Sequence, residues 1–307
     1  MAQVTGIEMT DAIRAQTQYV AQIFNEMADE YDHLKDPWYS YTFGEIERIL
    51  QRYFRLSSYD RAKPVVLDIG CGTGIQSLVF AQLGYCVEGI DIAENLIVRA
   101  RMKLRDAGFA DAHFQLADAV RLPFKDGIAD AVNCCGPTLS FVPEWRTALR
   151  EMSRCLKPGG RLLLEVEGKW NLDMLWEVVN AIAGNRLGYD KPLEKVLKQF
   201  LPLWNVGHWT NYPFVLESGE TVEMPLKLFT AAELTRELRQ VGLLVQKRWG
   251  LHVITNIIPS TVLHRADVSP SVWSIFRKLA RIERLVYDAW PFNALACSLL
   301  VLAVKKG

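Results

Sequence analysis

Short, almost wholly apolar runs alternate along the chain with segments whose apolar residues recur every three or four positions. The apolar runs predict buried strands at residues 65–67, 85–90, 112–116, 128–134 and 161–166, because a strand covered on both faces has little alternation. Helical spacing predicts helices at residues 75–83, 96–107 and 144–156. Strand followed by helix, repeated along the chain, predicts an α/β fold with a mostly parallel, doubly wound sheet.

The N-terminal stretch has no apolar strand run. Helical spacing at residues 20–31 and 43–54 predicts an N-terminal helical cap, which we place at residues 1–58. Asp36 and Pro37 are expected to break the chain between these two helices. The strand–helix repeat then fills a core at residues 59–168.

Two later stretches also depart from the repeat. Residues 169–228 are rich in tryptophan and tyrosine and lack strand–helix rhythm, so we expect a lid insertion there. The core resumes over residues 229–307, where Thr230 and Glu233 predict a capping box before a helix. Strands are expected at residues 243–249 and 295–304. Between them lies a second insertion, residues 251–291, whose main helix we predict at 272–289.

Composition excludes several classes of protein. The formal net charge is zero, so we expect no nucleic-acid partner. Six cysteines include no Cys-x-x-Cys pair, which favours reduced, buried thiols in a cytoplasmic protein and predicts no metal site. The N-terminal residues lack a signal-peptide core, and the longest apolar run is too short to span a bilayer as a helix.

Candidate chemistry concentrates where the first strand meets the first helix. There the chain reads Val-Leu-Asp-Ile-Gly-Cys-Gly-Thr-Gly, with glycines at Gly70, Gly72 and Gly74. Glycines let the backbone approach a ligand closely, and the following helix offers unpaired N–H groups. A dinucleotide fingerprint would require glycine at position 75, where the chain has Ile75. An NAD(P)-dependent dehydrogenase is therefore disfavoured.

This stretch resembles motif I of the class I S-adenosylmethionine (SAM) methyltransferases. The Lys-Pro-Gly-Gly turn at residues 157–160 is a second resemblance, and the segment from Phe24 to Asp32 is similar to the ubiquinone/menaquinone C-methyltransferase-like branch. The resemblance covers residues 24–168 strongly and 229–307 in pattern only. It implies a Rossmann-like seven-stranded sheet with an antiparallel last strand, and SAM as cofactor.

The resemblance also implies a set of cofactor-binding residues. Asp68 is expected near the methionine ammonium, Asp118 and Ala119 at the adenine, and Cys135 beside the methionine. Asp91, about twenty residues past the glycines, is where a ribose-binding carboxylate falls; a helix-capping role stays open. For Asp118, the alternative role is an Asx turn at the end of its strand. The full expected set is Tyr31, Asp68, Gly70, Cys71, Gly72, Gly74, Asp91, Ile92, Asp118, Ala119 and Cys135.

The acceptor side is less defined by the sequence. The titratable candidates for catalysis are His208, Tyr212, His252 and His33, each with a purely structural alternative. Tyr31 has one too, packing its helix on the core. The aromatic lid favours a small, apolar or aromatic acceptor over a macromolecule, and the sequence leaves the methylated atom and the oligomeric state open.

The leading hypothesis is methyl transfer from SAM to that acceptor by in-line displacement. The alternative is a non-catalytic SAM-binding or membrane-docking protein, whose basic helix at residues 272–289 would contact anionic lipid. We favour a simpler role for that helix, which is to cover the sheet or the acceptor pocket.

Overall fold

The structure of the chain is a computed structural model. It describes residues 2–29, 31–33, 36–56, 63–189, 191–199, 206–215, 221–265 and 267–307. Side chains are described for all of these except residues 2–10, 33, 199 and 212–215.

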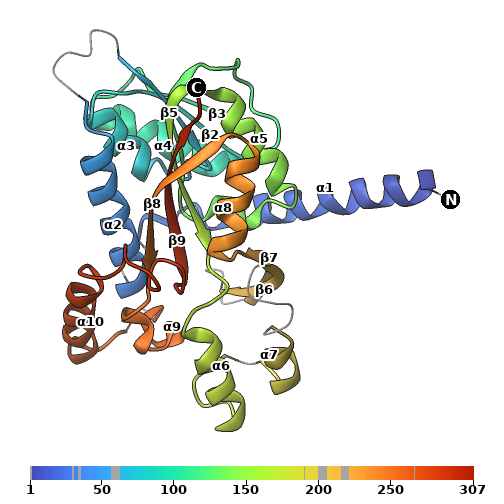
Figure 1. Cartoon of the computed structure of the whole chain (residues 1–307), viewed down its shortest axis with the longest axis vertical. Helices are drawn as coiled ribbons and strands as arrows, with labels where there is room; N and C mark the ends of the chain where they lie inside the picture. The colour runs from blue at the N-terminus through green and yellow to red at the C-terminus, as the bar shows by residue number, and fades with distance from the viewer. Residues whose placement is uncertain are drawn as a thin grey trace.

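A seven-stranded sheet forms the centre of the molecule (Figure 1). Its strands are β1 (Val65–Ile69), β2 (Cys86–Asp91), β3 (His113–Leu116), β4 (Ala129–Cys134), β5 (Leu156–Glu167), β8 (Leu243–Leu251) and β9 (Ser298–Lys305). The order across the sheet is β3-β2-β1-β4-β5-β9-β8. Strands β1 to β5 pair in parallel, and β9 runs antiparallel to both β5 and β8. The doubly wound sheet with an antiparallel last strand is confirmed.

Helices bury both faces of this sheet. The flanking helices are α3 (Ile75–Gln82), α4 (Glu94–Asp106), α5 (Trp145–Cys155) and α8 (Ala231–Gln240). One apolar core joins the sheet to α3, α4 and the second N-terminal helix, and the other joins it to α5 and α8. Because strand order reverses between β1 and β4, the helices that follow these strands diverge and leave a crevice at the carboxyl edge.

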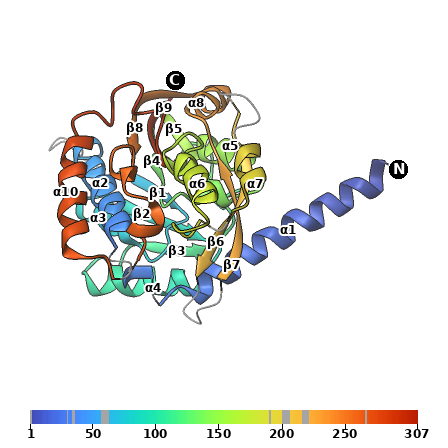
Figure 2. The ribbon, with the colours of Figure 1, turned by 90° about the horizontal axis from the view of Figure 1, so that it is seen from below.

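The N-terminal cap consists of α1 (Ala2–Glu26), a 3₁₀ turn η1 (Tyr31–His33) and α2 (Pro37–Tyr53). Helix α1 begins much earlier than the spacing at residues 20–31 indicated, and it extends away from the body in both views (Figures 1 and 2). Asp36 and Pro37 start a helix as well as ending the previous segment. The Asp36 carboxylate accepts the N–H of Tyr39 at 2.8 Å, and proline is tolerated in a first helical turn.

The lid insertion has its own secondary structure. It contains α6 (Asp173–Ile182), α7 (Leu193–Gln199) and a separate hairpin of β6 (His208–Val215) and β7 (Thr221–Leu228). The predicted capping box is half formed. Thr230 accepts the N–H of Glu233 at 3.1 Å, but the Glu233 carboxylate contacts Lys227 and the N–H of Gly207 instead of returning to Thr230.

The second insertion contains η3 (Thr255–Ile257), α9 (Ser260–Leu263) and α10 (Pro270–Glu283). Helix α10 ends six residues before the predicted boundary at 289, and turns follow it. Phe276 and Ala280 belong to one apolar cluster with Tyr41 of α2 and Leu251 at the end of β8, so this helix covers the cap beside the edge of the sheet. The expectation that it covers the acceptor pocket is not met, because no residue of α10 lines either cavity of the candidate site. No helix in the described part of the chain has the length and apolarity needed to cross a bilayer.

Candidate active site

The glycine turn between β1 and α3 adopts a backbone that side chains would prevent. Gly70, Gly72 and Gly74 all have positive φ, at 69°, 53° and 81°. A Cβ on Gly70 would lie 2.2 Å from Oγ1 of Thr138, in the short turn η2 (Thr138–Phe141) that follows β4. Glycine is therefore required at Gly70 both for its φ and for the space.

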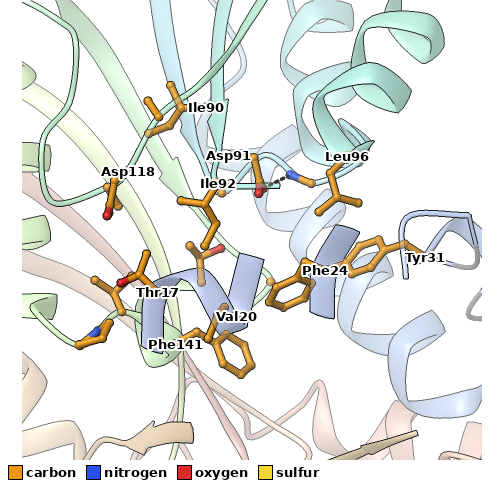
Figure 3. A pocket seen from close by; sticks show the side chains of 18 residues that line it. Thr17, Val20, Phe24, Tyr31, Ile90, Asp91, Ile92, Leu96, Asp118 and Phe141 are labelled. Atoms are coloured by element: carbon orange, nitrogen blue, oxygen red, sulfur yellow. Dashed lines mark hydrogen bonds between the residues drawn. The ribbon is translucent and has the colours of Figure 1, made fainter. Parts of the chain in front are cut away.

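A cavity of about 690 Å³, counted with the space that opens to solvent, lies beside this turn. Gly70 and Gly72 form one wall, and Asp91, at the carboxyl end of β2, forms another. Asp91 accepts the N–H of Gly72 at 2.9 Å (Figure 3). It also accepts the N–H of Ala93 at 2.9 Å. Its burial raises its pKa to about 6. The carboxylate thus holds the turn and still faces the cavity.

Asp118 and Ala119 line the same cavity, just after β3. Oδ1 of Asp118 accepts the N–H of Val120 at 3.1 Å, so the Asx turn considered from the sequence is present. The cavity-facing position and the turn coexist, because a carboxylate has further lone pairs to offer. Ile92 lines the cavity as well. Carboxylates from two neighbouring strands therefore meet in one cavity, as strand ends at a switch point should.

The N-terminal cap closes this cavity. Val20 and Phe24 of α1 and Tyr31 of η1 line it (Figure 3). The next residue, Asp32, is tied to the glycine turn: Thr73 donates its hydroxyl to Asp32 at 2.5 Å, and Lys103 contacts Asp32 at 2.7 Å. These contacts couple the position of Tyr31 to that of the turn.

Comparison with known proteins decides the family. Residues 67–164 match the model of a methyltransferase domain. The chain is 36% identical over 184 residues to the ubiquinone/menaquinone biosynthesis C-methyltransferase UbiE of Proteus mirabilis, covering 57% of this chain and 69% of that protein. It is 36% identical to the Vibrio vulnificus protein of the same name, over 53% of this chain and 62% of that one.

This chain belongs to the class I SAM-dependent methyltransferases. Within them it is similar to the ubiquinone/menaquinone C-methyltransferases, and SAM is its methyl donor. The solved CcbJ methyltransferase from Streptomyces caelestis is 14% identical, with a TM-score of 0.53 over 93% of this chain and 98% of that one. A SAM-dependent methyltransferase from Methanosarcina mazei is 21% identical, with a TM-score of 0.51 over 83% and 96%. These likenesses show the fold alone.

The residues around the first cavity fit SAM. Asp91 is suited to a ribose diol, which can donate two hydrogen bonds to a carboxylate. Asp118 and the N–H of Ala119 are suited to the adenine amino group and a ring nitrogen. The bare backbone at Gly70 and Gly72 leaves room for the amino-acid end of the ligand. These individual assignments remain predictions.

Four expected cofactor residues lie behind the cavity wall. Asp68 is 1% exposed and bonds Ser77 at 2.5 Å and Asn133 at 2.7 Å, so it braces the turn and lines neither cavity. Burial raises its pKa. Cys71 and Cys135 are core residues, and Gly74 starts α3 against Ala100. Gly136, next to Cys135, is the residue that reaches the cavity.

A second cavity of about 1,290 Å³ adjoins the first. Phe24, Tyr31, Gly136 and Phe141 line both. These four residues form the wall that the two cavities share. The rest of its wall comes from α2, from Pro137, from both insertions, from the end of β5 and from Cys297 and Ser298 at the start of β9.

The second cavity combines aromatic walls with carboxylates. Its aromatic side chains are Phe24, Tyr31, Trp38, Tyr39, Phe43, Phe141 and His264. Its acidic side chains are Glu165, Glu167, Asp173 and Glu177, and Lys191 is bonded to Glu177. Burial, with Glu165 and Asp173 nearby, raises the pKa of Glu167 to about 8. Burial and the carboxylates of Asp91 and Glu165 raise the pKa of Tyr31, so it remains a neutral phenol.

The described histidine candidates are not brought to this cavity. His252 is 0% exposed, bonds Thr42 at 2.8 Å and Thr255 at 3.1 Å, and stacks on Trp38 with ring centroids 3.6 Å apart. Its burial holds its pKa well below the usual value, so it is a neutral structural residue. This corrects its expected place beside the acceptor.

His208 also lines neither cavity. No described residue hydrogen bonds with its ring nitrogens, and burial with nearby lysines lowers its pKa to about 4. The side chains of His33 and Tyr212 lie outside the described residues. Sequence reasoning missed the acidic end of β5, although the signal was present: Leu-Leu-Leu-Glu-Val-Glu places two carboxylates two residues apart in a buried strand.

Proposed function

We propose that this methyltransferase acts on a small, ring-bearing acceptor that occupies the second cavity. The observation that carries the proposal is the shared wall of Phe24, Tyr31, Gly136 and Phe141, which joins the cavity whose residues suit SAM to a second one with aromatic walls. Flat rings pack well on such walls, in offset or edge-to-face contact. A macromolecule would need an open surface in place of a pocket lined by two insertions and a cap.

We further propose that the methylated atom is a carbon of a hydroxylated ring. The relatives' name, a C-methyltransferase of quinone biosynthesis, supports this. A ring carbon becomes a nucleophile when a neighbouring hydroxyl loses its proton, so the enzyme must take up that proton. The acidic cavity offers carboxylates for this task.

An amine is the second candidate acceptor. Four carboxylates and several aromatic side chains line the cavity, and this combination suits an ammonium group. Methylation would then require the ammonium to lose a proton before attack.

The test is methyl transfer from SAM labelled in its methyl group. Three acceptors are compared: a hydroxylated benzenoid or naphthalenoid ring, the same ring with its hydroxyls blocked, and an amine of similar size. We expect label on a ring carbon of the first and none on the blocked ring. Label on the amine alone would support the second candidate. No transfer to any of them, with SAM binding intact, would contradict a small-molecule acceptor.

A further inference from the structure

The carboxyl end of β5 carries Glu165 and Glu167, whose side chains share one face because they are two residues apart. Both line the acceptor cavity. We propose that Glu167 is the catalytic base that removes the acceptor's proton, and that Glu177 binds a second protic group of the same acceptor. This inference rests on the proposed function and adds the acceptor's chemical class: a ring with two hydrogen-bond donors.

Glu167 is the carboxylate left free to react. No described residue hydrogen bonds to its side chain, whereas its backbone N–H is held by Ser140 at 2.9 Å. Glu165 is occupied on both oxygens, by the N–H of Gly136 and the hydroxyl of Ser298, each at 2.6 Å. Its bond to Gly136 places it at the wall common to both cavities. Glu167 follows roughly 7 Å further along the strand, at about 3.3 Å per residue.

Two other titratable groups of the cavity, Asp173 and His264, have hydrogen-bond or ion-pair partners of their own. Asp173 accepts from Tyr189, from Asn256 at 3.0 Å and from the N–H of Ser260 at 3.2 Å. His264 faces Asp36 at 3.3 Å. Besides Glu165 and Glu167, the titratable and charged side chains facing this cavity are Tyr31, Tyr39, Asp173, Glu177, Lys191, His264 and Cys297.

Glu177 indicates how the far end of the acceptor is held. Its side chain is 9% exposed, and Oε1 contacts Lys191 at 2.5 Å. Its other oxygen, Oε2, is buried without a described partner, although it belongs to a cavity-lining residue. A buried acceptor atom left unpaired is costly, so an O–H or N–H of the ligand is the natural partner.

Glu167 takes the proton of a ring hydroxyl, and the oxygen lone pair adds electron density to the neighbouring ring carbon. That carbon forms a bond to the methyl group, while the bond between methyl and sulfur breaks with its electron pair left on sulfur. The resulting dienone loses the hydrogen of its methylated carbon as a proton to solvent, which restores the aromatic ring as a phenolate, and Glu167 then returns its proton to that oxygen. No oxidant or reductant is required.

The ionisation of Glu167 fits this role. With the cavity free of ligands its pKa is about 8, because burial and the charges of Glu165 and Asp173 disfavour the carboxylate. A cationic methyl donor nearby favours the carboxylate and lowers this pKa. The base therefore ionises near neutral pH when the donor is bound, and activity should rise with pH through the lowered value.

The test compares Glu167→Gln and Glu167→Asp in the full chain. Glu47→Gln, on the exposed side of α2, is the control. We expect Glu167→Gln to lower kcat about 10²- to 10⁴-fold without weakening SAM binding, and to abolish the rising limb of the pH profile. Glu167→Asp should keep that limb. The loss should shrink for acceptors whose hydroxyl is made more acidic by an electron-withdrawing substituent.

Other outcomes have distinct meanings. An unchanged kcat and pH profile in Glu167→Gln, with active wild type, would overturn the role of Glu167 alone. Inactivity of the wild type toward every small acceptor would instead refute the proposed function. For Glu177→Gln we expect a higher KM for an acceptor with two hydroxyls and a smaller change for one lacking the distal hydroxyl. Equal KM changes for both would overturn the second contact.

Discussion

Asp91→Asn is the sharpest test of the cofactor site. The wild-type carboxylate already accepts the N–H groups of Gly72 and Ala93, and it offers its remaining lone pairs to a diol. An asparagine keeps one oxygen, but its amide nitrogen would point hydrogens at one of those donors or at the ligand. Hydrogen bonds to a charged group contribute about 1.5–3 kcal/mol. Because about 1.4 kcal/mol is tenfold, SAM should bind about 10- to 150-fold more weakly.

Titration calorimetry measures the affinity for SAM directly, and the pH dependence of that affinity gives a second test. The pKa of Asp91 is raised to about 6, so the carboxylate is mostly protonated at about pH 5 and ionised at about pH 8. SAM affinity should therefore fall as pH drops through about 6 in the wild type and change less in Asp91→Asn. Asp106→Asn, exposed at the end of α4, is the control. If Asp91→Asn binds SAM as tightly as the control, our assignment of the ribose site is wrong.

Three further predictions concern stability and surface binding. Gly70→Ala should destabilise the fold and weaken SAM binding, because φ at this position is 69° and the new Cβ would clash with Thr138. Gly44→Ala, in the open part of α2, should instead raise the free energy of unfolding by about 0.5–1 kcal/mol. Denaturant unfolding of the two variants compares these effects. Glu283→Gln should lower the free energy of unfolding by about 1.5–3 kcal/mol, because this buried carboxylate accepts the four consecutive N–H groups of residues 252–255. An unchanged midpoint of denaturant unfolding would show that these N–H groups find other partners. We expect α10 to act as cover, so the chain should not sediment with anionic vesicles at low salt, although the exposed face of α10 carries apolar side chains beside Arg277 and Arg281. Salt-sensitive sedimentation that reversal of both arginines to glutamate removes would show instead that α10 docks on the membrane.

The first half of the chain could be predicted from its sequence in most respects. Strands β1, β2 and β4 and the second half of β5 are mainly apolar runs, and such runs are specified locally, whereas β3 (His-Phe-Gln-Leu) is half polar. The glycine turn and Asp91 followed from the same logic. Asp91 and Asp118 reach one cavity because parallel strands end at one edge of a sheet.

The acceptor side depends on contacts between distant segments, which spacing does not encode. His252 follows β8 and looked close to the carboxyl edge, yet Thr42 and Trp38 of α2 bury it. Glu167 ends a mainly apolar strand, and the pattern of apolar residues alone predicts that such a position belongs to the core. The role that we propose for Glu167 can be recognised only from the fold, which places Asp173 and Glu177 of α6 in the same cavity.

Tyr31 belongs to the wall of both cavities, and its neighbour Asp32 is fastened to Thr73 and Lys103. The wall of the second cavity is therefore complete only when the N-terminal cap is bound to the glycine turn. Val20, Phe24 and Tyr31 of the cap also line the first cavity, so we expect the cap to control the entry of the nucleoside as well. Catalysis should consequently follow a compulsory order, in which the donor enters first and leaves last. Little donor should then be lost to hydrolysis before the acceptor binds.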